Sequence, residues 1–352
     1  MQSGKKLATG FLPIILSLLA MLLAACGGGA STGPTTSAAP AHASADKQIY
    51  VLPEQGVADI ATFDPGLSTD SYSIIAIDMV YTGLVQLDDN GAPYDELAAS
   101  HKLASDGVTW TFTLRDNLKF SDGTPLTSAD VAYSINRALL PSEKSITAPI
   151  YLALVKDSDK LNAGKIKTII GDSVLTPDPK TVVIIANKKA AYFLEALTYS
   201  CSYVVEKSLV EKWGLSFGDH LADGTGGGSG PWMVSKYAHN KEIDFVPNPN
   251  YYGPKPQLKK VIFPFYKVSD TAYRAYQTNQ VDYAQRVPTA QLASAQALPN
   301  GQFHKVPQLW INYYAMNYLV KPFDNIHIRQ AFALAINKDL IVHSIYKDIL
   351  IP

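Results

Sequence analysis

The sequence has no surplus of basic residues. Its 30 lysines and arginines face 31 aspartates and glutamates, so the formal net charge of the 352-residue chain is −1. Removal of residues 1–25 would take away Lys5 and Lys6 and leave a net charge of −3. Nucleic-acid-binding domains usually carry a basic patch or stripe. The composition therefore predicts no nucleic-acid partner.

The motifs of common enzymes and metal sites are also missing. The seven histidines include no H-E-x-x-H pair. The glycine-rich run from Gly224 departs from the dinucleotide pattern at Ser229 and from the nucleophile elbow at Pro231, and no P-loop lysine follows it. A turn that needs a permissive backbone explains this run better. We predict no catalytic residue, no metal and no cofactor, and an exported hydrolase is the least favoured alternative.

Cysteine is scarce, and the first of the two cysteines ends an export-type segment. Residues 1–25 start with Lys5 and Lys6, continue as a mostly apolar run and end in small residues, as a secretory signal peptide does. Leu23-Ala24-Ala25-Cys26 resembles the lipobox of bacterial lipoproteins. That resemblance implies a lipid on Cys26 and a mature chain anchored to the cell membrane, in the periplasm or on the outer face. The alternative is an uncleaved membrane anchor.

A flexible linker is predicted at residues 26–46. The stretch Gly27–Ala45 has no acidic or basic side chain and consists of small residues, proline and one histidine, so it cannot bury enough apolar surface to fold. If Cys26 carries lipid, Cys201 has no partner for an intramolecular disulfide. The remaining chain must then be stabilised by its hydrophobic core. Cys201 is expected to be a small buried apolar residue.

The stretch from Val108 to Leu140 holds the clearest structural pattern. Its first part alternates, which predicts a half-buried strand. The residues predicted on the buried face are Val108, Trp110, Phe112 and Leu114. Ser121-Asp122-Gly123 supplies turn residues. A helix is predicted from about Thr127, with Asp130 three residues later as an acidic variant of the capping box.

Other segments complete an α/β pattern of strands and helices. Predicted strands lie at Ile49–Leu52, Ile166–Ile170, Thr181–Ala186, Glu242–Val246 and Val261–Tyr266. Predicted helices lie at Ser71–Leu84, Ala190–Tyr199 and Ala272–Val281.

Several of these stretches resemble one protein family. Trp110–Arg115 followed by Phe120–Val131 resembles the signature of extracellular solute-binding proteins of family 5, the dipeptide- and oligopeptide-binding components of ABC importers. Asn248–Gly253 and Pro322–Ala331 resemble further elements of that family. The glycines after Gly224 exceed the family's G-T-G-P turn, and we expect them to loosen this loop. The resemblance implies an α/β fold like the type II periplasmic binding proteins, with two lobes that close around a solute.

The resemblance also implies a division of the chain. The segment that would build most of the second lobe is not in the sequence, so we expect a C-terminally truncated member, whether a fragment, a truncated gene or a split reading frame. The expected parts are a lipoprotein signal peptide at residues 1–25, a linker at 26–46, a first-lobe core domain at 47–83 and 198–309, an accessory subdomain of that lobe at 84–197, and the start of the second lobe at 310–352.

The function implied by the family is capture of peptides outside the membrane and their delivery to ABC permease subunits, by a protein expected to be monomeric. Motif offsets imply ligand contacts at Ser73, Tyr151 and Gln285. Each of these is equally well explained as an ordinary core or surface residue. The same scaffold could instead bind a nickel chelate, haem or an oligosaccharide, because a fold does not fix its ligand. A non-functional fragment is a further alternative.

Overall fold

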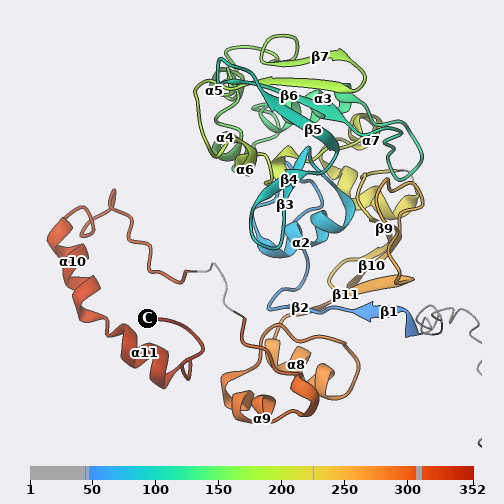
Figure 1. The fold of residues 1–352 in the computed structure, drawn as a ribbon. Helices are drawn as coiled ribbons and strands as arrows, with labels where there is room; N and C mark the ends of the chain where they lie inside the picture. The colour runs from blue at the N-terminus through green and yellow to red at the C-terminus, as the bar shows by residue number, and fades with distance from the viewer. Residues whose placement is uncertain (1–43, 45–46, 225, 307–310) are drawn as a thin grey trace, which may run out of the picture. The chain divides into compact units, whose positions relative to one another are not determined.

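The structure is a computed structural model that describes residues 44, 47–224, 226–306 and 311–352. The chain divides into two units, residues 1–43 and 44–352. The predicted signal peptide, Cys26 and nearly all of the predicted linker lie outside the described residues. The elements discussed below belong to the second unit (Figure 1).

The first sheet gathers strands from the start of the described chain and from residues 232–266. Its central strand β11 (Lys260–Tyr266) pairs in parallel with β1 (Ile49–Val51) and β2 (Glu54–Gln55). On its other side β11 pairs antiparallel with β10 (Glu242–Pro247), which pairs with β9 (Trp232–Ala238). Segments about 200 residues apart in sequence therefore share one sheet.

Helices and loops bury one cluster of apolar residues around this sheet. α2 (Ser71–Val80) contacts β9, and α7 (Lys207–Trp213) contacts the 3₁₀ helix Gly214–Asp223. The large fully buried side chains of the cluster are Ile77, Tyr81, Phe217, Phe245 and Phe263. Ile243 and Phe245 lie two positions apart on β10, so their side chains point to the same face of the strand, and both are buried.

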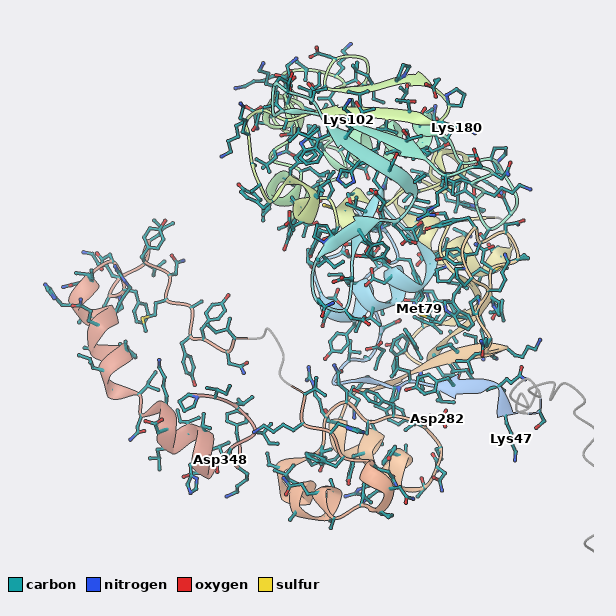
Figure 2. All side chains as sticks on the ribbon, in the orientation of Figure 1. Lys47, Met79, Lys102, Lys180, Asp282 and Asp348 are labelled. Atoms are coloured by element: carbon teal, nitrogen blue, oxygen red, sulfur yellow. The ribbon has the colours of Figure 1, made fainter. Side chains whose placement is uncertain are left out.

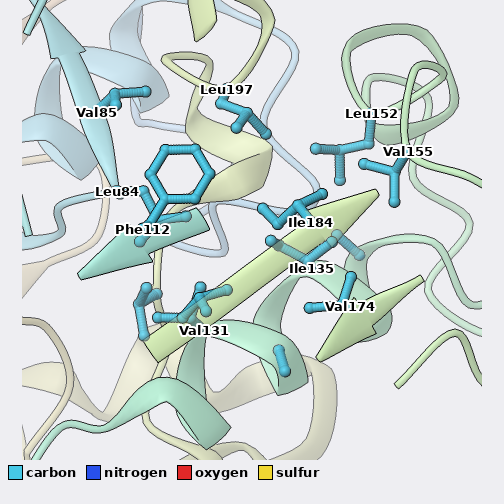
Figure 3. Packing of buried hydrophobic residues seen from close by; sticks show 14 of the residues in the cluster. Leu84, Val85, Phe112, Val131, Ile135, Leu152, Val155, Val174, Ile184 and Leu197 are labelled. Carbon is cyan, nitrogen blue, oxygen red and sulfur yellow. The ribbon is translucent and has the colours of Figure 1, made fainter. Parts of the chain in front are cut away.

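The second sheet is antiparallel, in the order β5 (Ala98–Leu103), β6 (Thr109–Leu114), β8 (Thr181–Ile185) and β7 (Val174–Asp178). α3 (Ser128–Ala138) contacts β7 and β8. Figure 3 shows the apolar side chains of this second cluster, among them Phe112 from β6, Ile135 from α3 and Ile184 from β8. A hairpin of β3 (Val85–Leu87) and β4 (Pro93–Asp95) precedes it.

The central sequence pattern is confirmed. In β6, Trp110, Phe112 and Leu114 are buried. Thr127 is the N-cap of α3, and the Asp130 carboxylate accepts a hydrogen bond from the Thr127 backbone N–H at 2.8 Å. This is the capping interaction that the spacing of the two residues predicts.

The predicted strand at Ile166–Ile170 is wrong. Only an isolated bridge between Ile170 and Val174 forms there, and the strand β7 starts at Val174. The side chain of Asn136 explains the difference, because its oxygen accepts the Ile169 N–H at 3.0 Å. The Ile169 carbonyl then accepts the N–H groups of Ser173 and Val174 in a tight turn, so the backbone of this run is not available to a neighbouring strand.

Two predicted helices are shorter than the sequence suggests. The helix predicted at Ser71–Leu84 ends at Val80, whose carbonyl accepts the Gly230 N–H at 2.8 Å, and Tyr81 is extended. Within Ala190–Tyr199, only α6 (Phe193–Ala196) forms. The Thr198 hydroxyl donates to the Glu195 carbonyl at 2.8 Å and competes with further helical turns.

The glycine-rich run is packed rather than loosened, so that expectation is wrong. Residues 226–230 are all buried. The Gly227 N–H donates to a Glu206 carboxylate oxygen at 3.1 Å, and the hydroxyls of Ser229 and Thr82 are 2.7 Å apart. A side chain at Gly228 or Gly230 would clash with the backbone of Val80, and these glycines let the loop approach the end of α2.

The remaining helices are short and lie mostly in the last third of the described chain. They are α4 (Ala148–Tyr151), α5 (Ser158–Asn162), α8 (Ser269–Gln277), α9 (Leu292–Gln296), α10 (Ile326–Ala335) and α11 (Lys338–Ser344). Cys201 is buried, as predicted. Among the helices that the structure describes, none combines the length and the apolar character needed to cross a membrane.

Candidate binding site

Ser73 lies in the first turn of α2 and is fully buried. Its backbone N–H and its hydroxyl both donate to the Asp70 carboxylate, at 2.9 and 2.7 Å. The hydroxyl also accepts the Ala61 N–H at 3.0 Å. In this structure Ser73 joins the start of α2 to the preceding loop, and its predicted contact with a ligand stays a prediction.

Tyr151 is the last residue of α4, and its ring is one of two stacked tyrosine rings. Its ring is parallel to that of Tyr199, with ring centroids 3.7 Å apart and an angle of 5° between the planes. It also borders a hollow of about 420 Å³. The lining residues are Ile150, Tyr151, Ala153, Leu154, Asn187, Lys188, Tyr192 and Ala196. An aromatic stack beside an apolar hollow suits contact with apolar groups of a ligand.

Gln285 is exposed and follows the segment that returns to the first sheet. This segment is fixed at Asp282, labelled in Figure 2, whose carboxylate accepts the Val51 N–H at 2.7 Å. It is fixed again at Arg286, whose N–H donates to the Gln55 side chain at 2.7 Å. The structure thus ties Gln285 to β1 and β2, while Ser73 and Tyr151 lie on helices.

Glu54 and Asp70 were not among the predicted site residues. Glu54 lies on β2 and is only 4% exposed, and Asp70 is the N-cap residue of α2. Burial raises the pKa of the Glu54 carboxyl to about 7, and the negative charge of Asp70 adds to the effect. The sequence shows only an acidic residue two positions after the apolar strand Ile49–Leu52, and acidic residues are rarely fully buried.

Burial raises the pKa of the Tyr199 phenol, and the neighbouring Tyr151 raises it further. The Ser73 hydroxyl donates to Asp70, and the Tyr151 ring stacks on Tyr199. These contacts place Ser73 at the start of α2 and Tyr151 beside the hollow.

The described residues offer no obvious site for a metal. No group of three or more histidine, cysteine, aspartate or glutamate side chains that could hold an ion occurs among them. The predicted residues and their contacts offer a carboxylate at the start of α2, and phenol rings with apolar side chains beside the hollow. Such groups bind cationic and aromatic or aliphatic parts of a ligand.

Comparison with known proteins gives a consistent result. Residues 92–352 match the family described as bacterial extracellular solute-binding proteins, family 5 Middle. The chain is 28% identical over 289 residues to the oligopeptide-binding protein OppA of Bacillus subtilis, covering 80% of this chain and 51% of that protein. It is 27% identical over 334 residues to the dipeptide-binding protein DppE of the same organism, covering 94% of this chain and 59% of that protein.

Solved structures show the same relationship. The murein tripeptide-binding protein MppA of Escherichia coli superposes with a TM-score of 0.75 at 26% identity, covering 84% of this chain and 56% of that one. A periplasmic oligopeptide-binding protein of Borrelia burgdorferi gives a TM-score of 0.73 at 25% identity, covering 84% of this chain and 58% of that one. The predicted fold class, α/β and like the type II periplasmic binding proteins, is confirmed.

The chain spans little more than half the length of the curated relatives it matches. Members of the family are substrate-binding proteins found outside the cytoplasm. The match covers well over half of this chain and includes the strand–turn–helix stretch on which the resemblance was first based. The chain belongs to the bacterial extracellular solute-binding proteins of family 5.

Proposed function

We propose that this chain is part of the substrate-binding component of an ABC importer and binds peptides outside the membrane. The observation that carries the proposal is the family match over residues 92–352, together with relatives whose names state that they bind oligopeptides and dipeptides. Delivery to permease subunits, closure of two lobes and a monomeric state belong to the same proposal.

The division of the chain is part of this proposal as well. One apolar cluster uses residues from 60–81 and 203–263, and the other uses residues from 84–204. These clusters support a first-lobe core at residues 47–83 and 198–309 and an accessory subdomain at 84–197. A signal peptide at 1–25 and a lipid on Cys26 are proposed from the sequence alone. Residues 310–352 are proposed to start a second lobe.

Binding to a mixed peptide library tests the ligand class. We expect isothermal titration calorimetry to detect binding of peptides and no binding of oligosaccharides, haem or nickel chelates at the same concentrations. Mass spectrometry should recover the bound peptides intact, because a binding protein leaves its ligand unchanged. Heat from a sugar or metal complex with none from peptides would reject the proposal, and cleaved peptides would favour a hydrolase.

Tyr151 offers a test of the contact surface. Replacement by alanine removes one face of the stack with Tyr199 and should weaken peptide binding roughly tenfold, since aromatic contacts contribute about 0.5–1.5 kcal/mol beyond the area they bury. Tyr151→Phe keeps the ring and should bind like the wild type. Tyr94→Ala, at an exposed position on β4, serves as the control. If all three variants bind peptide as tightly as the wild type, Tyr151 does not contact the ligand.

A further inference from the structure

The hollow beside Tyr151 contains apolar side chains that the fold leaves uncovered. Ile150 on α4 is 65% exposed, Tyr192 at the N-cap of α6 is 56% exposed, and both line this hollow of about 420 Å³. Leu152 and Phe193, close to them in sequence, are almost fully buried in the apolar cluster of the second sheet. Large apolar side chains gathered around an exposed hollow are typical of a binding surface.

Hydrogen bonds and ring stacking hold the walls of the hollow in place. The backbone N–H and the side-chain amide of Asn187 donate to the carbonyls of Leu154 and Ala153, at 2.8 and 2.7 Å. These bonds join the segment after β8 to the turn after α4. Tyr151 stacks on Tyr199 and holds α4 against the segment that follows α6. Because its walls are fixed before a ligand binds, the hollow can select a ligand group by size and polarity.

The hollow also presents a positive charge. Lys188 is the only charged residue among the described residues that line it. Its ammonium is exposed and forms no ion pair or hydrogen bond with any residue that the structure describes. The neighbouring Lys189 does not line the hollow, and its side chain packs over Gly107. An apolar hollow with one available ammonium is complementary to a ligand that has a carboxylate beside an apolar group.

We propose that this hollow makes the protein prefer peptides in which a bulky apolar side chain stands next to an acidic one. This inference rests on the proposed function and deepens it, because it names the class of peptide. The apolar side chain would contact Ile150 and Tyr192, and the acidic side chain would pair with the ammonium of Lys188. Pockets of about 300–1,000 Å³ hold drug-sized ligands, so the hollow has room for a whole aromatic side chain. A protein that recognised only the peptide backbone would show no such preference.

Tetrapeptide amides test the preference in the wild type. The probes carry Phe-Glu, Phe-Gln or Ala-Glu between two alanines, and a second set has each central pair in reverse order. The C-terminal amide removes the carboxylate of the chain end, so the glutamate side chain is the only anionic group. In at least one order, calorimetry should show the peptide with Phe and Glu binding at least about threefold more tightly than that with Phe and Gln, and at least about tenfold more tightly than that with Ala and Glu.

Two adjacent lysines separate a local ion pair from the effect of overall charge. Lys188→Gln should lose the preference for glutamate over glutamine and keep the preference for phenylalanine over alanine. Lys189→Gln removes the same charge one residue away, outside the hollow, and should keep both preferences. If the two variants lose the glutamate preference equally, overall charge is responsible and the inference is wrong.

Two exposed isoleucines test the apolar part of the hollow. Ile150→Ser should reduce the preference for phenylalanine over alanine at least about threefold and leave the glutamate preference unchanged. Ile146 is 69% exposed but does not line the hollow, so Ile146→Ser is the matched control and should bind like the wild type. Both replacements are at the surface, and the protein should remain folded. If Ile150→Ser keeps the full preference for phenylalanine, the apolar side chain does not occupy the hollow and the inference is wrong.

The outcomes separate the inference from the proposed function. If the wild type binds all probes equally, or binds none of them while peptides of the mixed library bind, the inference is wrong and peptide binding stands. If no peptide from the library binds, the proposed function is wrong, and the inference falls with it.

Discussion

Replacement of Arg137 by methionine is expected to lower the free energy of unfolding by about 3–5 kcal/mol. Arg137 is 4% exposed and forms a two-pronged pair with Asp64, with N–O distances of 3.0 and 2.6 Å. Glu143 contacts the same guanidinium at 2.6 Å. Methionine fills a similar volume but leaves the fully buried Asp64 charge without its cation, and only the Gly66 N–H still donates to this carboxylate, at 2.9 Å. Denaturation by urea, followed by tryptophan fluorescence, measures the loss.

A control and a rescue make this prediction specific. Arg115 is exposed and donates to the backbone carbonyls of Glu96 and Asp95, so Arg115→Met should cost no more than about 1 kcal/mol. Adding Asp64→Asn to Arg137→Met removes the uncompensated charge and should recover part of the lost stability. A cost below about 1 kcal/mol for Arg137→Met alone would show that the buried pair contributes little.

The pair also joins parts of the chain that the sequence could not connect. Asp64 belongs to the loop before α2, next to the apolar cluster of the first sheet, and Arg137 lies on α3, whose apolar face packs in the other cluster. No local pattern predicts a contact between residues 73 positions apart. Asp64-Pro65 reads as a loop and Arg137 reads as the basic end of a helix, and both descriptions are correct without revealing the ion pair.

Local sequence patterns predicted correctly the elements whose structure depends mainly on residues within the element. In β6, alternation fixes which side chains are buried, and in α3 the capping residues lie within one turn of each other. The run Ile166–Ile170 shows the limit. Its β-branched residues favour a strand, but the Asn136 side chain, more than 30 residues earlier, takes the Ile169 N–H and forms a turn instead.

The candidate site was only partly predictable for the same reason. Family motifs led to Ser73, whose hydroxyl donates to Asp70, and to Tyr151, whose ring stacks on that of Tyr199. Glu54 was missed because its burial depends on the pairing of β2 with β11, more than 200 residues away. Whether a polar side chain has a partner is a property of the packed structure. Sequence shows that the residue is acidic, and only the fold shows that it is buried and unpaired.

Replacement of Gly228 by alanine is expected to destabilise the protein by at least about 3 kcal/mol, at the upper end of the range for overpacked interiors. An added Cβ would lie 1.9 Å from the Val80 carbonyl oxygen and 2.7 Å from its carbonyl carbon. The obstacle is backbone, so no side-chain rotation can relieve it. The loop cannot easily withdraw either, because the Gly230 N–H donates to the same Val80 carbonyl and the Gly228 carbonyl accepts the Ser121 N–H.

Gly91→Ala is the matched control for this substitution. Gly91 has a positive φ of 78°, but an added Cβ there would meet nothing within 4 Å. It should cost about 1 kcal/mol from backbone strain alone. Urea denaturation of both variants compares the two effects. Equal losses would mean that the glycine-rich run moves freely and that its tight contact with Val80 is not required.

The clash at Gly228 should also reach the candidate site. Val80 is the last residue of α2, and Asp70 and Ser73 hold the first turn of the same helix. If alanine displaces the end of α2, the position of Ser73 in the first turn of the same helix changes as well. We therefore expect any Gly228→Ala protein that folds at low temperature to bind peptides more weakly than the wild type. Gly91→Ala should keep the wild-type affinity, since Gly91 lies in the turn between β3 and β4. A folded Gly228→Ala protein with unchanged affinity would show that α2 tolerates the displacement.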